Sequence, residues 1–99
     1  MKIEIVDEAK EDLIRGYWFY EEQARGLWTY FLDSIFADID SFLLYAGVHR
    51  VVYGSHRHLA SRFPFAIYYR IEADVVRVRA ALDCRRNPKS IQGRLRSAK

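Results

Sequence analysis

Apolar residues recur along the chain with two different periods, and these predict a helical half followed by a strand-rich half. Residues 2–6 alternate polar and apolar side chains, which predicts a short strand. Asp7 suits an N-cap position, and the helical spacing of the apolar residues after it predicts an amphipathic helix over 8–24. A second helix is expected over 27–45, after a short link in which Gly26 supplies a left-handed residue. Helices joined so closely form an antiparallel hairpin.

The second half of the chain alternates in the manner of strands. Strands are predicted over 56–60, 65–71 and 75–83, with a hairpin turn at Ala73 and Asp74 joining the last two. This register pairs the apolar residues of one side as Phe65 with Leu82, Ile67 with Ala80, Tyr69 with Val78, and Ile71 with Val76. That side is expected to pack against the helices.

The other side of the same two strands is expected to be open and basic. It carries Ala66, Tyr68, Arg70, Arg77, Arg79 and Ala81. After the last strand, Asn87 as N-cap and Pro88 as first residue predict a short basic helix through Leu95. The pattern therefore predicts a single α+β domain over 1–99, with one antiparallel sheet, helices on one face and a basic C-terminal helix.

Composition and charge narrow the class of protein further. The chain has 99 residues, of which 51% are hydrophobic, and contains no apolar run near the roughly 18–20 residues of a membrane span. No export signal is visible, and the single cysteine, Cys84, fits a reducing compartment, so we expect a cytoplasmic protein. Residues 1–46 carry four basic and ten acidic side chains (−6), whereas 47–99 carry twelve basic and three acidic ones (+9). Such a basic half indicates an anionic partner.

The candidate binding residues combine arginines with aromatic side chains. Arg70 and Arg77 are expected to be cross-strand neighbours, an arrangement that is unfavourable unless an anion binds there, although the face could also be merely solvated. The apolar stripe of the second helix is broader than one sheet contact needs, so part of it is expected to face a partner. The predicted binding residues are Arg70, Arg77, Arg79, Tyr68, Arg85, Arg86, Trp28 and Phe36. An alternative for Arg85 or Arg86 is an ion pair with Asp83 or with a carboxylate of a helix.

The remaining reactive side chains give no metal or cofactor motif. His49, His56 and His58 lack a further ligand of suitable spacing, so structural or surface roles are expected and no metal site is predicted. Cys84 is expected to be an inert, buried thiol. No cofactor is predicted, because no glycine-rich phosphate loop, paired catalytic carboxylates or nucleophile elbow occurs in the sequence.

Two segments carry a resemblance to a known family. They are Arg62-Phe-Pro-Phe-Ala-Ile-Tyr-Tyr-Arg-Ile-Glu72 and Val75-Val-Arg-Val-Arg-Ala-Ala-Leu-Asp-Cys-Arg-Arg-Asn-Pro88. With the order of elements, they resemble the RelE/ParE toxin superfamily, most closely its ParE-type, plasmid-stabilisation branch. The resemblance implies a bacterial type II toxin–antitoxin pair, in which a cognate antitoxin winds around the toxin. It also implies that DNA is contacted only indirectly, through the antitoxin.

The family resemblance implies two different activities. RelE-like members cut mRNA in the ribosome without a metal, and Arg85 matches their arginine after the last strand. Their arginine at the start of the third strand is Phe65 here, and their C-terminal tyrosine falls near Ile91. If the chain were such a nuclease, Arg85, His56 and Arg57 would be its candidate catalytic residues.

ParE-like members instead inhibit DNA gyrase by binding it, which needs no hydrolytic residues. The missing nuclease groups favour this branch, and gyrase is the expected target. A nontoxic member that retains only antitoxin binding is a third possibility.

Overall fold

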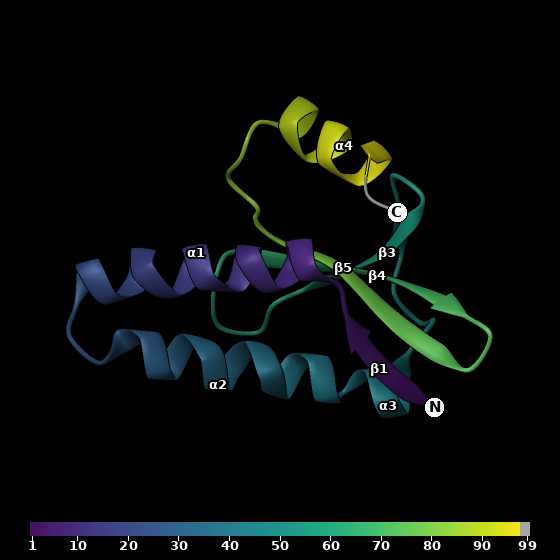
Figure 1. Cartoon of the computed structure of the whole chain (residues 1–99), viewed down its shortest axis with the longest axis horizontal. Coiled ribbons are helices and arrows are strands. Elements are labelled where there is room, and N and C mark those ends of the chain that lie inside the picture. The colour runs from purple at the N-terminus through teal and green to yellow at the C-terminus, as the bar shows by residue number, and fades with distance from the viewer. Residues whose placement is uncertain (98–99) are drawn as a thin grey trace.

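The computed structural model describes residues 1–97 and has the α+β architecture expected from the sequence (Figure 1). The helices are α1 (Asp7–Gln23), α2 (Leu27–Asp40), α3 (Phe42–Tyr45) and α4 (Pro88–Ser97). The strands are β1 (Lys2–Ile5), β2 (Val51–Val52), β3 (Ser55–Leu59), β4 (Phe65–Glu72) and β5 (Val75–Asp83). One sheet contains all of them, in the order β1-β5-β4-β3-β2. No helix within residues 1–97 is long and apolar enough to cross a membrane.

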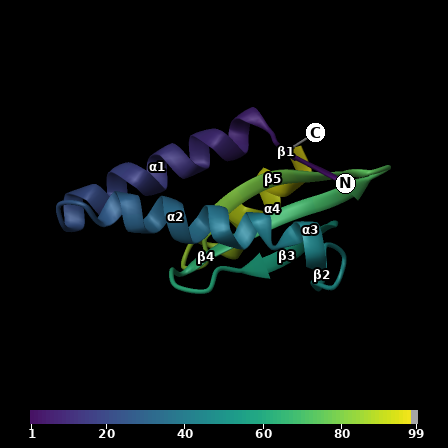
Figure 2. The same cartoon turned by 90° about the horizontal axis from the view of Figure 1, so that it is seen from below.

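The predicted helical hairpin is formed by α1 and α2, which lie side by side (Figure 2). Gly26 has the expected left-handed backbone, with φ of 83°. The predicted N-cap, Asp7, is instead the first residue of α1, and Val6 occupies the N-cap position. The N–H of Val6 still donates to the Val78 carbonyl of the sheet at 3.0 Å. Asp7 instead adds negative charge to the first turn of α1, where the helix dipole favours it.

The second predicted helix is interrupted at Ser41. Its hydroxyl donates to the Asp38 carbonyl at 2.5 Å, a back-bond that competes with regular helical geometry. As a result α2 ends at Asp40, and the rest of the predicted helix forms the short α3.

The sheet is mixed because its N-terminal strand runs parallel to the last one. Ile5 on β1 pairs with Val78 on β5, whereas the other neighbouring strands pair in antiparallel fashion. The short edge strand β2 was not predicted, since two residues are too few to give a recognisable alternation.

A β-bulge divides the pairing of β4 and β5 into a predicted half and a shifted half. Tyr69 pairs with Val78 and Tyr68 with Ala80, so Arg79 is the extra residue between them. On the turn side of the bulge, the predicted pair of Tyr69 and Val78 is confirmed, as is that of Ile71 and Val76.

Beyond the bulge, the predicted register is wrong by one residue. Phe65 pairs with Asp83 instead of Leu82, and Ile67 pairs with Ala81 instead of Ala80. Because side chains alternate along a strand, this shift turns Ala81 toward the helical hairpin and Leu82 away from it.

The two faces of the sheet carry two separate apolar clusters. The main cluster joins α1 and α2 to the sheet, with Phe31, Ile35, Ile67 and Val78 fully buried. The smaller cluster lies on the opposite face, where α4 packs on the strands, and comprises Ala66, Tyr68, Ala80, Leu82, Ile91 and Leu95. The basic face is therefore not open: α4 covers part of it.

Candidate functional site: an apolar groove and a cationic cleft

An apolar groove runs along one side of the helical hairpin, between α1 and α2, and reaches the end of β1. It has a volume of about 330 Å³ and is lined by Ile5, Lys10, Leu13, Ile14, Tyr17, Leu32 and Phe36. Leu32 and Phe36 are one helical turn apart on α2 and face Ile14 and Tyr17 on α1. Phe36 is 41% exposed and Ile14 56% exposed, and contiguous apolar surface of this kind is typical of a site for protein binding.

Aromatic rings continue this apolar surface toward the end of the hairpin. Tyr17 lies between Trp18 and Trp28, with ring centroids 4.8 and 4.7 Å away. Trp28 is half-buried by this packing, whereas Trp18 is 58% exposed. Of the three aromatic residues predicted for partner binding, the two on the hairpin take different positions: Phe36 lines the groove, and Trp28 packs on Tyr17.

The predicted neighbours Arg70 and Arg77 do face one another across β4 and β5. Arg77 forms ion pairs with Glu72 at 2.9 Å and with Glu4 of β1 at 3.3 Å. Arg70 is exposed, and its Nε donates to the Gly54 carbonyl at 3.0 Å. Two carboxylates therefore compensate the repulsion that the sequence suggested would require a bound anion.

Arg79 and Tyr68 are not available for binding, because α4 covers them. Arg79 is 1% exposed and donates to Ser55 Oγ at 2.6 Å and to the Leu95 carbonyl at 2.9 Å. Tyr68 is 3% exposed, and burial raises the pKa of its phenol. The prediction of an open face is wrong here because Ile91 and Leu95, one turn apart on α4, form an apolar stripe that needs a partner surface.

Arg85 and Arg86 differ although they are adjacent. Arg85 makes a two-pronged contact with Asp83, through Nε at 2.9 Å and Nη2 at 2.6 Å, which holds the pKa of that carboxyl below its usual range. This is the ion pair that the sequence left open as an alternative. Arg86 donates to Ser90 Oγ at 3.0 Å and lines the cleft described below.

The candidate nuclease residues are not brought together. His56 stacks on Tyr69, with ring centroids 5.0 Å apart, on the side of the sheet that faces the hairpin. Arg57 follows it in β3 and pairs with Tyr68, whose side chain points to the opposite face. Arg85 lies past the end of β5 in its ion pair with Asp83.

The histidines form a hydrogen-bonded chain that the sequence did not reveal. His49 Nδ1 contacts the Tyr69 hydroxyl, and His49 Nε2 lies 3.1 Å from His58 Nδ1. His58 Nε2 lies 3.4 Å from Asp38 Oδ1 without forming a hydrogen bond, and Asp38 accepts from the Ser61 hydroxyl at 2.7 Å. Among residues 1–97, no group of three or more His, Cys, Asp or Glu side chains is arranged to hold a metal ion. The contacts connect α2, the loop before β2, β3 and β4 in one polar network.

Cys84 is exposed instead of buried. Desolvation nevertheless raises the pKa of its thiol, which opposes the effect of the nearby Arg57 and Arg85 and disfavours the thiolate.

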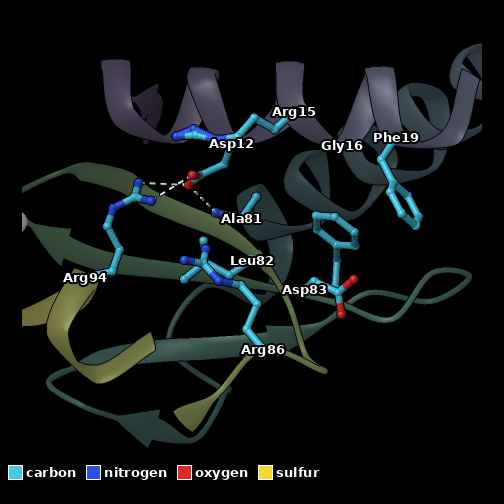
Figure 3. Close-up of a pocket in the computed structure, with 10 residues that line it drawn as sticks. Asp12, Arg15, Gly16, Phe19, Ala81, Leu82, Asp83, Arg86 and Arg94 are labelled. Carbon is cyan, nitrogen blue, oxygen red and sulfur yellow. Dashed lines mark hydrogen bonds and ion pairs between the residues drawn. The ribbon is translucent and has the colours of Figure 1, made fainter. Parts of the chain in front are cut away.

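A cationic cleft of about 540 Å³ opens between α1, the end of β5 and the side of α4 that carries Arg94 (Figure 3). It is lined by Asp12, Arg15, Gly16, Phe19, Phe65, Ala81, Leu82, Asp83, Arg86 and Arg94. Only glycine fits at residue 16, because a Cβ there would lie 2.6 Å from Cζ of Phe31. Sequence reasoning missed the cleft because its walls come from four segments that are separated along the chain: α1, the start of β4, the end of β5 with the loop after it, and α4.

Comparison with known proteins shows that this chain has the same fold as a solved structure. No family model matches the sequence, and no curated protein matches it either. A solved chain from the chromosomal ParDE toxin–antitoxin system of P. aeruginosa superposes with a TM-score of 0.74 and is 16% identical. The match covers 82% of this chain and 92% of that one. The two chains share a fold, which confirms the ParE-like fold expected from the sequence resemblance.

Proposed function

We propose that the protein is the toxin of a bacterial toxin–antitoxin pair and is neutralised by a cognate antitoxin. The observation that carries the proposal is the fold shared with a chain of a ParDE toxin–antitoxin system, together with an apolar groove on the helical hairpin. An amphipathic helix of the antitoxin would place its apolar side chains against Phe36, Leu32 and Ile14.

We further propose that the toxin acts in the cytoplasm by binding DNA gyrase, without nuclease chemistry. Cleavage of RNA without a metal needs a base, a cation and an acid around one phosphate. His56 and Arg57 lie on opposite faces of the sheet, and Arg85 is held by Asp83, which supports a mechanism based on binding.

Growth on induction tests the proposal directly. The chain is expressed from a tight promoter, alone and together with the product of the adjacent reading frame. We expect growth arrest with the chain alone and growth with both proteins. Continued growth with the chain alone would contradict the toxin proposal and favour a nontoxic member that binds antitoxin only. Arrest accompanied by cleavage of ribosome-bound mRNA would favour the nuclease alternative.

A further inference from the structure

The cationic cleft holds two guanidinium groups, of Arg15 and Arg86, that form no ion pair within residues 1–97, although Asp83 attracts Arg86 at longer range. Of its two carboxylates, Asp12 binds Arg94 through both oxygens, at 2.7 and 2.8 Å, and Asp83 binds Arg85. Within residues 1–97, neither Arg15 nor Arg86 has an ion-pair partner. The positive charge of the cleft that is open to a ligand therefore comes from these two side chains.

The cleft also offers apolar contact next to this charge. Phe19 on α1 lies at the rim and is 44% exposed, while Phe65 and Leu82 form buried parts of the wall. Figure 3 shows Arg15 and Phe19 coming from α1 on one side, with Arg86 on the other. A ligand that fits this surface has carboxylates and an apolar side chain close together.

The backbone at the floor of the cleft is already paired. Strand β1 accompanies β5 only as far as Val78, so the edge of β5 beyond it has no neighbouring strand among the described residues. At that edge, Asp12 accepts the N–H of Ala81 at 3.0 Å, and Arg94 lies 3.4 Å from the carbonyl of Arg79. These contacts occupy backbone groups that an added strand would use, so recognition in the cleft depends on side chains.

We infer that the cleft binds an acidic segment of the antitoxin, whose carboxylates meet Arg15 and Arg86 while a neighbouring apolar side chain packs on Phe19. The identity of the partner rests on the proposed function. The site is separate from the apolar groove, because the groove and the cleft lie on opposite flanks of α1: Ile14 and Tyr17 line the first, and Arg15 and Phe19 the second.

A titration with a synthetic peptide tests the cleft without the antitoxin. The probe is a capped peptide, Glu-Asp-Leu-Glu-Glu, added at low ionic strength to the ¹⁵N-labelled chain and followed by NMR. We expect saturable shifts of the Nε–H signals of Arg15 and Arg86 and of the amides near Phe19. A peptide with glycine in place of leucine should bind more weakly. Shifts confined to Arg70, or no saturable shifts, would overturn the inference.

Charge reversal tests the same site in the complete pair. We expect Arg15→Glu combined with Arg86→Glu to weaken the complex at least about tenfold and to reduce its salt dependence. The matched control reverses Arg25 and Arg62, two exposed arginines outside the cleft. Equal affinities of the two double variants would overturn the cleft assignment. If the unaltered chain does not bind the antitoxin at all, the proposed function is contradicted instead. The peptide titration then still shows whether the cleft binds an acidic segment.

Discussion

The guanidinium of Arg94 on α4 and the carboxylate of Asp12 on α1 form a two-pronged ion pair between the two ends of the chain. The side chain of Asp12 is 3% exposed and that of Arg94 is 19% exposed, so the pair is largely shielded from water. Asp12 also accepts the N–H of Ala81, which connects α1, α4 and the sheet through one carboxylate. This pair holds α4 against the face of the sheet that would otherwise be open.

Removal of the Arg94 side chain should therefore destabilise the fold. In Arg94→Ala the buried carboxylate of Asp12 loses its cation, and breaking such a pair lowers the free energy of unfolding by about 3 kcal/mol. Urea denaturation measures the change. Arg96→Ala, at an exposed position of the same helix, is the control and should stay close to the unaltered chain. Similar stabilities of the two variants would show that the ion pair does not hold α4.

Arg79 should behave as a structural residue. Arg79→Met keeps the volume of the side chain but removes the hydrogen bonds to Ser55 and Leu95, so the free energy of unfolding should fall by about 1–3 kcal/mol. Arg70→Met, at the exposed neighbouring position, should change stability little. Affinity for the antitoxin, measured on the folded fraction by calorimetry, should be the same for both. A loss of affinity in Arg79→Met that Arg70→Met does not show would contradict this role and indicate that Arg79 contacts the antitoxin.

The histidine network should make stability depend on pH. Burial and the neighbouring rings of His58 and His56 lower the pKa of His49. Because His49 then binds a proton more readily in the unfolded state than in the folded state, acidification favours unfolding. The stability that neutral His49 allows is complete above the ordinary histidine pKa, and it decreases as the pH falls through about 6.5 and below. The other groups facing this chain of contacts are Tyr69, beside His49, and Asp38, beside His58.

Urea denaturation between pH 7.5 and pH 5 measures this effect. The loss of stability on acidification should be smaller in His49→Gln than in the unaltered chain. His56→Gln keeps the contact between His49 and His58 and should retain most of the dependence. Identical pH profiles for the unaltered chain and His49→Gln would contradict the role given to His49.

The apolar groove should be the main contact for the antitoxin. Phe36→Glu places a charge in the groove and should weaken the complex by about 100-fold, the effect of losing a central aromatic contact. The fold should be retained, because Phe36 is 41% exposed. Leu44→Glu introduces the same charge at an apolar residue that is 80% exposed and outside the groove. Equal affinities of the two variants in calorimetry would place the antitoxin elsewhere.

Local patterns in the sequence predicted the elements of the fold. The helical spacing identified α1 and a second helix that covers all of α2 and continues through α3, and alternation identified β3, β4 and β5 within one residue of their observed ends. The prediction failed where a single residue changes the phase of a pattern. The bulge at Arg79 leaves no mark on composition, yet it shifts the side chains beyond it to the opposite faces.

The candidate site was less predictable, because it depends on contacts between distant segments. Phe36 could be expected at a partner surface from the breadth of the apolar stripe on its helix. The burial of Arg79 and Tyr68 could not be predicted from local patterns, because it requires α4 to fold back over the sheet. The only indication of it in the sequence was the apolar stripe formed by Ile91 and Leu95. Arg15 and Phe19 gave no signal until α1 was placed beside the end of β5.

Supercoiling by DNA gyrase is the most direct test of the proposed activity. Purified gyrase is assayed on relaxed plasmid with the chain alone and with the chain saturated by its antitoxin. We predict that the chain alone inhibits supercoiling, that the saturated complex does not, and that Arg85→Ala inhibits as well as the unaltered chain. Undiminished supercoiling with the chain alone, together with cleavage of ribosome-bound mRNA that Arg85→Ala abolishes, would contradict a toxin that acts by binding.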